Sequence, residues 1–131
     1  MGSPQVQAVM DFMSCWVRLD LADALSRTAP DIAFRPDPAA ETLHGQAAVG
    51  DLWGKYMKMF RSYEFEVVCT ATSGGVVFLE RIERLTMTDG RTMALPIVAV
   101  FELDASNRLT AWRDYWDTAM SVPAPATQGG A

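Results

Sequence analysis

The chain has 131 residues, half of them hydrophobic, a formal net charge of −5 and a pI near 4.7. This length fits one domain with a substantial core, and the acidic balance without a basic cluster disfavours nucleic-acid binding. No stretch reaches the roughly 18 apolar residues of a membrane span, and the first residues lack the features of a signal peptide. We therefore expect a soluble, cytoplasmic protein with no nucleic-acid or membrane partner.

Helical patterns open the chain. Ser3 can cap a first helix that tolerates Pro4 in its opening turn, and an apolar face follows at helical spacing. That face consists of Val6, Val9, Met10, Met13 and Val17. Asp20 can cap a second, shorter helix over residues 21–27. This helix should end before Pro30, because the residue before a proline avoids helical geometry.

A short strand, a loop and another helix come next. Residues 31–35 are expected to form the strand, and two prolines within residues 36–40 predict an irregular loop. A helix begins after Gly45, and its apolar face is made of Val49, Leu52, Trp53, Tyr56 and Phe60. We expect most of this face to be ordinary core, with the flexible Met57 and Met59 suited to an irregular cavity beside it.

The hydrophobic period changes to two from residue 62 onward, which predicts long strands. They cover residues 63–69, 76–87, 92–103 and 109–117, with short turns between them. Connections this short predict an antiparallel meander. Pro96, inside the third of these strands, predicts a bulge or bend.

This order of elements predicts the α+β class. We expect the N-terminal helices to pack in a strongly curved, mixed or antiparallel sheet, forming a cone with an internal apolar pocket. The cone should be a single domain over residues 1–121, and residues 122–131 should be a flexible C-terminal tail. Cys15 and Cys69 lack metal-site spacing and are expected to be buried, reduced thiols. The single histidine, His44, is expected to have a structural or solvent-facing role, and no metal site is predicted.

Charged residues stand on the more apolar face of two predicted strands. In the second strand, the odd positions are apolar except for Arg81 and Glu83. In the fourth, the even positions place Asp114 between Trp112 and Trp116. Side chains two residues apart in a strand share a face. All three charged groups therefore meet in the cavity if the apolar faces line it.

A guanidinium between two carboxylates can hold both through charge-assisted hydrogen bonds. Burial and Arg81 shift the carboxyl pKa values in opposite directions, which favours one protonated and one ionised carboxyl group. Such a pair supplies a general acid and a general base in one apolar pocket. Parity alone leaves open an exposed cross-strand ion pair worth at most ~1 kcal/mol, although the tryptophans beside Asp114 favour burial. On the opposite face, Arg113 and Asp117 are expected to pair in solvent.

Four segments carry a resemblance to a known family: residues 79–83, 88–92, 97–102 and, most specifically, the Trp-Arg-Asp-Tyr-Trp-Asp sequence of residues 112–117. They resemble the limonene-1,2-epoxide hydrolase family, within the nuclear transport factor 2-like or SnoaL-like superfamily. The resemblance implies a cofactor-independent epoxide hydrolase, a small apolar substrate and a homodimer. Asp114 would deprotonate water, Glu83 would protonate the epoxide oxygen, and Arg81 would bridge them. The residues expected to line the pocket are Phe34, Trp53, Tyr56, Leu79, Trp112 and Trp116.

The chain departs from the family pattern at a few positions. The family has Asp in place of Glu83, and it has a Tyr and an Asn that help to hold the water in place of Phe34 and Pro36. The other candidates to hold that water are Asp37, Tyr56 and Tyr63. Asp37 is also a second candidate for the base. The alternatives are an isomerase, dehydratase or epoxide-opening cyclase that uses the same acid–base pair, or a non-catalytic small-molecule binder.

Overall fold

The computed structural model describes residues 3–121. Its elements, in chain order, are α1 (Pro4–Val17), α2 (Leu21–Ser26), β1 (Thr28–Arg35), β2 (Leu43–His44), α3 (Gln46–Met59), β3 (Phe60–Ser73), β4 (Val76–Met87), β5 (Thr92–Leu103), β6 (Leu109–Tyr115) and the 3₁₀ turn η1 (Thr118–Met120). Residues 122–131, predicted to form a flexible tail, lie outside the described residues. Within residues 3–121, no helix is long and apolar enough to cross a membrane.

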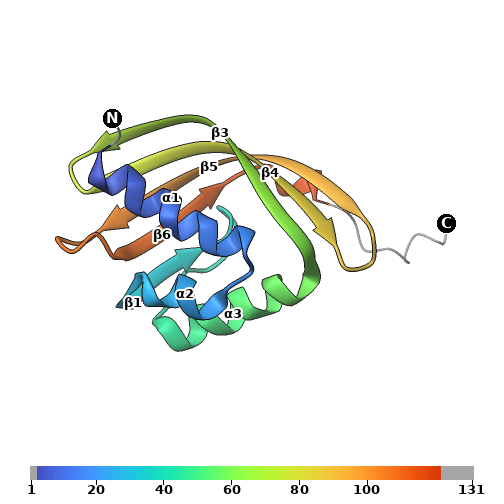
Figure 1. Cartoon of the computed structure of the whole chain (residues 1–131), viewed down its shortest axis with the longest axis horizontal. Helices are drawn as coiled ribbons and strands as arrows, with labels where there is room; N and C mark the ends of the chain where they lie inside the picture. Colours follow the sequence, from blue (N-terminus) through green and yellow to red (C-terminus); the bar gives the residue numbers. More distant parts are fainter. Residues whose placement is uncertain (1–2, 122–131) are drawn as a thin grey trace.

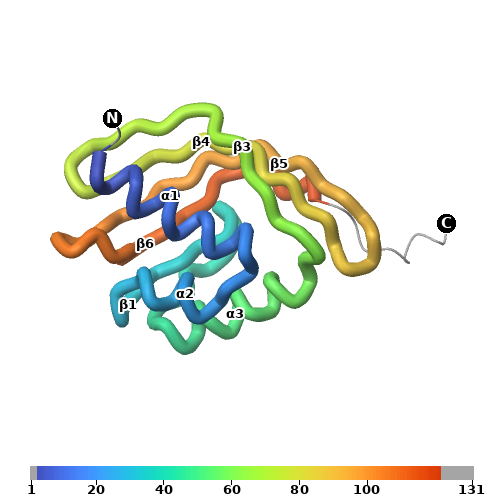
Figure 2. The backbone as a smooth tube through the Cα atoms, viewed as in Figure 1, coloured from blue at the N-terminus to red at the C-terminus, as the bar shows by residue number. Residues whose placement is uncertain are grey.

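The strands form one six-stranded sheet in the order β2-β1-β6-β5-β4-β3. β1 runs parallel to β6, and the other neighbouring strands are antiparallel. Figures 1 and 2 show the sheet curving over the three helices, with the hairpin of β4 and β5 extending past the end of β6. The predicted α+β cone with a curved mixed sheet is confirmed, and the sheet is open rather than closed.

α1 begins at the predicted cap, where Ser3 Oγ accepts a hydrogen bond from the backbone N–H of Val6 at 3.1 Å. Its buried face is Val9, Phe12, Met13, Cys15 and Trp16. Val17, predicted to continue the apolar stripe, is instead 44% exposed. Phe12 and Trp16 are four residues apart and share one side of the helix. Because these rings have far more apolar surface to bury, they decide which side of α1 faces the sheet.

Aromatic rings fill the space between the helices and the sheet. Contacting ring centroids lie 4.8–6.2 Å apart in a cluster of Phe12, Trp16, Phe34, Trp53, Phe101 and Trp112. Aromatic pairs of this kind contribute about 0.5–1.5 kcal/mol beyond their area burial. The parallel pairing of β1 with β6 places Phe34 directly opposite Trp112. These two residues also border the pocket described below, so the cluster supports one of its walls.

A bulge in β3 makes one prediction wrong. The register between β3 and β4 shifts between Val67 and Cys69, so that Val67 lies opposite Arg81 and Cys69 lies opposite Glu80. Adjacent residues in a strand face opposite sides, and one extra residue therefore reverses the alternation. Cys69 consequently lies on the outer face, and it is exposed like every residue from 66 to 73 of this edge strand, whereas Cys15 is buried as predicted. Both are free thiols.

Pro96 does not cause the predicted bulge. It lies opposite Ile82 in a continuous β4–β5 register. The ladder between β5 and β6 ends at Val98 and Tyr115. Past that point no β6 residue pairs with β5, so a missing N–H at Pro96 costs no hydrogen bond on that side.

Candidate active site

The three charged residues lie on the inner face of the sheet, as parity predicts. Arg81 and Glu83 come from β4, and Asp114 comes from β6. β5 separates these strands, with Ile97 opposite Arg81 and Ala99 opposite Asp114. Neighbouring strands lie about 4.8 Å apart. Reaching across β5 therefore takes a side chain as long as arginine, and the small Ala99 leaves room for it.

The Arg81 guanidinium bridges the two carboxyl groups. Nη2 donates to Glu83 Oε2 at 2.8 Å and to Asp114 Oδ2 at 3.2 Å, while Nη1 donates to Asp114 Oδ1 at 3.4 Å. Trp112 Nε1 also donates to Asp114 Oδ1, at 2.7 Å. Arg81 is fully buried and Asp114 is only 7% exposed. The alternative of a solvent-exposed ion pair is therefore wrong.

Burial and charge set the protonation of this cluster. Burial raises the pKa of Asp114 above its ordinary value; the Arg81 charge opposes this rise, and the Glu83 charge adds to it. Burial alone would lower the pKa of Arg81, but Asp114, Tyr63 and Glu83 together raise it well above its ordinary value. Arg81 therefore stays cationic, and Asp114 is a stronger base than an exposed aspartate.

Glu83 has a second donor, the hydroxyl of Tyr63 in β3. This hydroxyl donates to Glu83 Oε2 at 2.6 Å. In the β3–β4 register Tyr63 lies opposite Leu85, and Phe65 lies opposite Glu83, so the contact is diagonal. Sequence reasoning missed this role and offered Tyr63 only as a water ligand. The register between the two strands is the signal that reveals it.

An apolar pocket of about 190 Å³ opens beside the two carboxyl groups. Its lining comes from α1, α3, the strands β1, β3, β4, β5 and β6, and the residues that follow β1 and β6. The lining residues are Trp16, Phe34, Pro36, Tyr56, Met59, Phe60, Tyr63, Glu83, Leu85, Met87, Met93, Leu95, Ile97, Trp112, Asp114, Trp116 and Ser121. Glu83 and Asp114 are the charged residues in this lining. A ligand in the pocket would therefore meet both carboxyl groups in otherwise apolar surroundings.

Four of the predicted pocket residues line this cavity: Phe34, Tyr56, Trp112 and Trp116. Trp53 and Leu79 do not, because both are completely buried in the core. Aromatic rings surround Trp53, and Leu79 lies opposite Ala99 beneath the helices. The pocket extends instead toward the β4–β5 hairpin, where sequence reasoning missed its lining residues Leu85, Met87, Met93 and Leu95.

The structure separates the three candidate water ligands. The hydroxyl of Tyr63 is engaged with Glu83. Asp37 is not part of the pocket lining, and its Oδ1 accepts a backbone hydrogen bond within its own loop at 2.9 Å. Tyr56 lines the pocket, and its hydroxyl makes no hydrogen bond in the described part of the chain. Burial raises the pKa of Tyr56, and the charges of Asp37 and Asp114 add to the rise.

The remaining charged candidates lie away from the pocket. His44 is exposed on β2, as predicted. Arg113 donates to Glu102 at 2.6 Å rather than to Asp117, because the β5–β6 register makes Glu102 its diagonal neighbour on the outer face. Asp117 instead caps η1, with Oδ1 accepting from the N–H of Ala119. Among residues 3–121, no group of three or more His, Cys, Asp or Glu side chains is placed to hold a metal ion.

Similar solved structures define the class of fold. A putative SnoaL-like polyketide cyclase from Shewanella putrefaciens CN-32 superposes with a TM-score of 0.82 at 17% identity, covering 91% of this chain and 83% of that one. An LEH-like epoxide hydrolase from M. tuberculosis, where LEH denotes limonene-1,2-epoxide hydrolase, gives 0.77 at 21% identity over 88% and 84%. The epoxide hydrolase/cyclase-like enzyme SalBIII, described in pyran ring formation in polyether salinomycin, gives 0.79 at 13% identity over 88% and 92%. At these identities the likeness shows the SnoaL-like, nuclear transport factor 2-like fold alone.

The family follows from the sequence. The family model of the limonene-1,2-epoxide hydrolase catalytic domain matches residues 3–123. The chain belongs to the limonene-1,2-epoxide hydrolase family, which confirms the predicted resemblance. Structures of this fold are described as an epoxide hydrolase and as cyclase-like proteins, so the fold does not select one reaction.

Proposed function

We propose that this protein opens small apolar epoxides by one-step acid–base addition of water, without a cofactor. The observation that carries the proposal is the pair of carboxyl groups, Asp114 and Glu83, that border one apolar pocket and share the Arg81 guanidinium. Opening an epoxide requires a nucleophile at carbon and a proton on the leaving oxygen. One ionised and one protonated carboxyl group supply both requirements. The apolar lining suits a hydrocarbon substrate.

In the proposed step, Asp114 removes a proton from water as the water oxygen bonds to an epoxide carbon. The ring carbon–oxygen bond breaks, and its oxygen takes the proton of Glu83. One water is consumed and a vicinal diol forms. Asp114 ends protonated and Glu83 ionised, and proton exchange with solvent restores both. Because Arg81 Nη2 lies within 3.2 Å of both carboxyl groups, the negative charge stays beside the guanidinium as it moves.

We propose that the attacking water lies between Asp114 and Tyr56. Asp114 Oδ1 already accepts from Trp112 and Arg81, whereas Oδ2 accepts from Arg81 alone among residues 3–121. A carboxylate oxygen has room for a further donor, so Oδ2 is the atom available to water. The Tyr56 hydroxyl supplies a pocket hydrogen-bonding group that Phe34 cannot provide.

Glu83→Gln should lower kcat by about 10²–10⁴-fold, the usual contribution of a general acid. Glutamine keeps the size of the side chain but has no proton to give. Turnover of a panel of terpene, cyclohexene and styrene epoxides measures the effect. Glu80→Gln is the matched control, because Glu80 is exposed on the outer face of the same strand and should leave the rate unchanged. Equal rates for wild type and Glu83→Gln would remove Glu83 from the mechanism.

The second candidate function is a cyclase, isomerase or dehydratase that uses the same acid–base pair without adding water. The observation favouring it is the β1 side of the pocket, where the side chains of Phe34 and Pro36 offer water no hydrogen bond. A hydroxyl of the substrate itself could then take the place of water. Reaction in H₂¹⁸O separates the two: hydrolysis gives a diol with one labelled oxygen, and the alternative gives an unlabelled product. Tight binding without turnover would indicate a non-catalytic binder.

The outer face of the sheet carries exposed apolar side chains from three adjacent strands, β4, β5 and β6. They are Phe78 at 38%, Val98 at 40% and Tyr115 at 40% exposure, with Val98 directly opposite Tyr115. We propose that this face binds a second copy of the chain, in line with the predicted homodimer. We also propose the predicted cytoplasmic location. Val98→Lys should shift the sedimentation mass from dimer to monomer, because it places a charge in an apolar contact. Val17→Lys, on the helix side, should leave a dimer; a monomeric wild type would contradict the proposal.

A further inference from the structure

The carboxyl group of Glu83 needs more contacts to fix its position than the carboxyl group of an aspartate would need there. Its side chain has one more rotatable bond than the aspartate of the family pattern, and therefore more rotamers to choose from. A proton donor must adopt one of them, because a misplacement of about 1 Å can cost roughly 10²-fold in rate. Arg81 alone provides one contact, a single 2.8 Å hydrogen bond to Oε2. One contact leaves the carboxyl group free to rotate about it.

The second contact on Oε2 comes from Tyr63. Oε2 accepts from Arg81 Nη2 at 2.8 Å and from the Tyr63 hydroxyl at 2.6 Å. Oε1 makes no hydrogen bond within residues 3–121, and Glu83 borders the pocket. Because Oε2 accepts from both donors, Oε1 is the oxygen on which the proposed general acid would carry its proton. Oε1 is therefore the oxygen left free to donate to a substrate.

The Tyr63 ring is itself fixed. The residue is 3% exposed, and its ring centroid lies 5.9–6.4 Å from those of Trp16, Phe60 and Phe65. Burial, together with the charge of Glu83, raises the pKa of Tyr63 well above its ordinary value. The hydroxyl therefore keeps its proton and remains a donor throughout the neutral range.

We infer that Tyr63 is a positioning residue for the general acid: it holds Oε2 of Glu83 so that Oε1 delivers the proton to the epoxide oxygen. Tyr63 keeps its own proton throughout, and the transferred proton moves from Oε1 to the ring oxygen as the carbon–oxygen bond breaks. This inference rests on the proposed function. It also explains how a glutamate can serve at position 83 in place of the aspartate of the family pattern, because the longer side chain reaches the Tyr63 hydroxyl.

A double-mutant cycle tests the inference. Tyr63→Phe removes the hydroxyl and keeps the ring, and it should lower kcat by about 10- to 100-fold with little change in KM. In the Glu83→Gln background the same substitution should cause no further loss, since no proton remains to be positioned. Thr72→Val, which removes an exposed hydroxyl from the same strand β3 outside the pocket lining, is the control and should retain the wild-type kcat. Thermal unfolding of each variant shows that it is folded.

The outcomes separate the inference from the proposed function. An equal loss from Tyr63→Phe in both backgrounds would overturn the positioning role, because it would mean that Tyr63 acts through the fold. An unaltered kcat in Tyr63→Phe, with a loss in Glu83→Gln, would overturn the positioning role alone. A wild-type rate in Glu83→Gln would overturn both.

Glu83→Asp supplies a second background for the same test. The shorter side chain withdraws the carboxyl group from the Tyr63 hydroxyl, so Tyr63→Phe should cost less there than in wild type. A cost in the Glu83→Asp background as large as in wild type would contradict a role that depends on the 2.6 Å contact.

Discussion

Asp114→Asn should reduce kcat for epoxide opening by about 10²–10⁴-fold, the contribution typical of a general base. Asparagine has the same size, and its carbonyl oxygen can still accept from Trp112, but it cannot take a proton from water. The effect should be large because burial raises the pKa of Asp114, which makes its carboxylate a stronger base than an exposed one. Initial rates at saturating epoxide, with the diol quantified, measure the loss.

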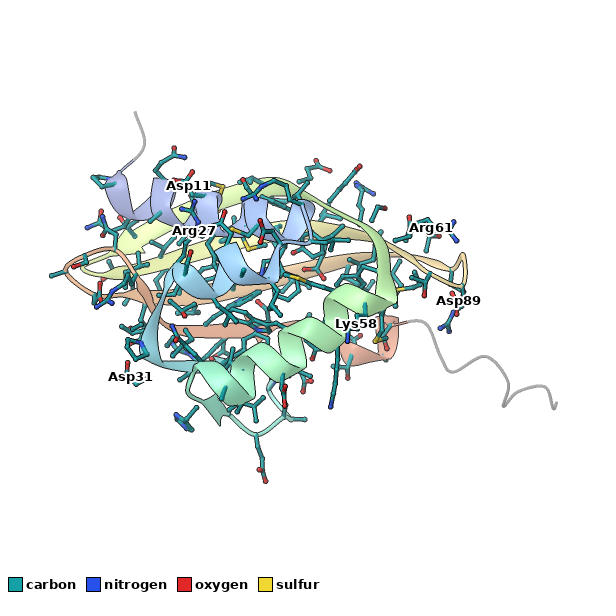
Figure 3. All side chains as sticks on the ribbon, turned by 60° about the horizontal axis from the view of Figure 1, so that its bottom comes forward. Asp11, Arg27, Asp31, Lys58, Arg61 and Asp89 are labelled. Atoms are coloured by element: carbon teal, nitrogen blue, oxygen red, sulfur yellow. The ribbon has the colours of Figure 1, made fainter. Side chains whose placement is uncertain are left out.

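Asp31→Asn is the matched control for this variant. Asp31 is exposed and projects from the edge of the molecule in Figure 3, far from the chemistry proposed for the pocket. It should retain the wild-type kcat. Full activity in Asp114→Asn would contradict its role as the base. Asp37, the second candidate base, lies outside the pocket lining, so its substitution should not reproduce the loss.

The charged centre of the pocket could be predicted from the sequence because a strand alternates with a period of two. Arg81, Glu83 and Asp114 interrupt the apolar sets of their own strands, so alternation puts them on the more apolar face, and the tryptophans beside Asp114 favour its burial. That inference holds wherever the register is unbroken, as it is along β4 and β5. It fails in β3, where the bulge after Val67 turns Cys69 outward, because a bulge leaves no mark in the alternation preceding it.

The pocket walls could not be predicted to the same degree. Periodicity shows which residues are apolar, but the curvature of the sheet decides whether they meet a helix or line a cavity. Trp53 and Leu79 therefore belong to the packed core, while Met87 and Met93 at the far hairpin border the pocket. Hydrophobic periodicity could not predict the parallel pairing of β1 with β6 either. This pairing joins segments about 80 residues apart, and its register depends on tertiary packing.

Arg81→Met should lower the free energy of unfolding by about 3–5 kcal/mol at neutral pH, the usual cost of leaving a buried charge without its partner. Methionine has a similar reach and an apolar surface, so it fills much of the space of the arginine stem. What it cannot replace is the hydrogen bonding to Asp114 and Glu83, both of which would lose their cation. Urea unfolding measures the difference. Arg84→Met, which removes an exposed pair with Glu66, should cost less than about 1 kcal/mol.

The pH dependence of this loss identifies its cause. Burial raises the pKa of Asp114 in the folded protein and Arg81 holds the rise in check, so the variant should have a still higher folded pKa. A carboxyl group whose pKa is raised by folding contributes stability that is present below its unfolded pKa and is lost as the pH rises through the folded value. The deficit of Arg81→Met should therefore be smallest near pH 4 and grow toward pH 8. Adding Asp114→Asn should recover part of the loss, because it removes one uncompensated carboxylate. A deficit that is the same at both pH values and additive with Asp114→Asn would mean that Arg81 stabilises the fold by packing, and that the carboxyl groups do not depend on it.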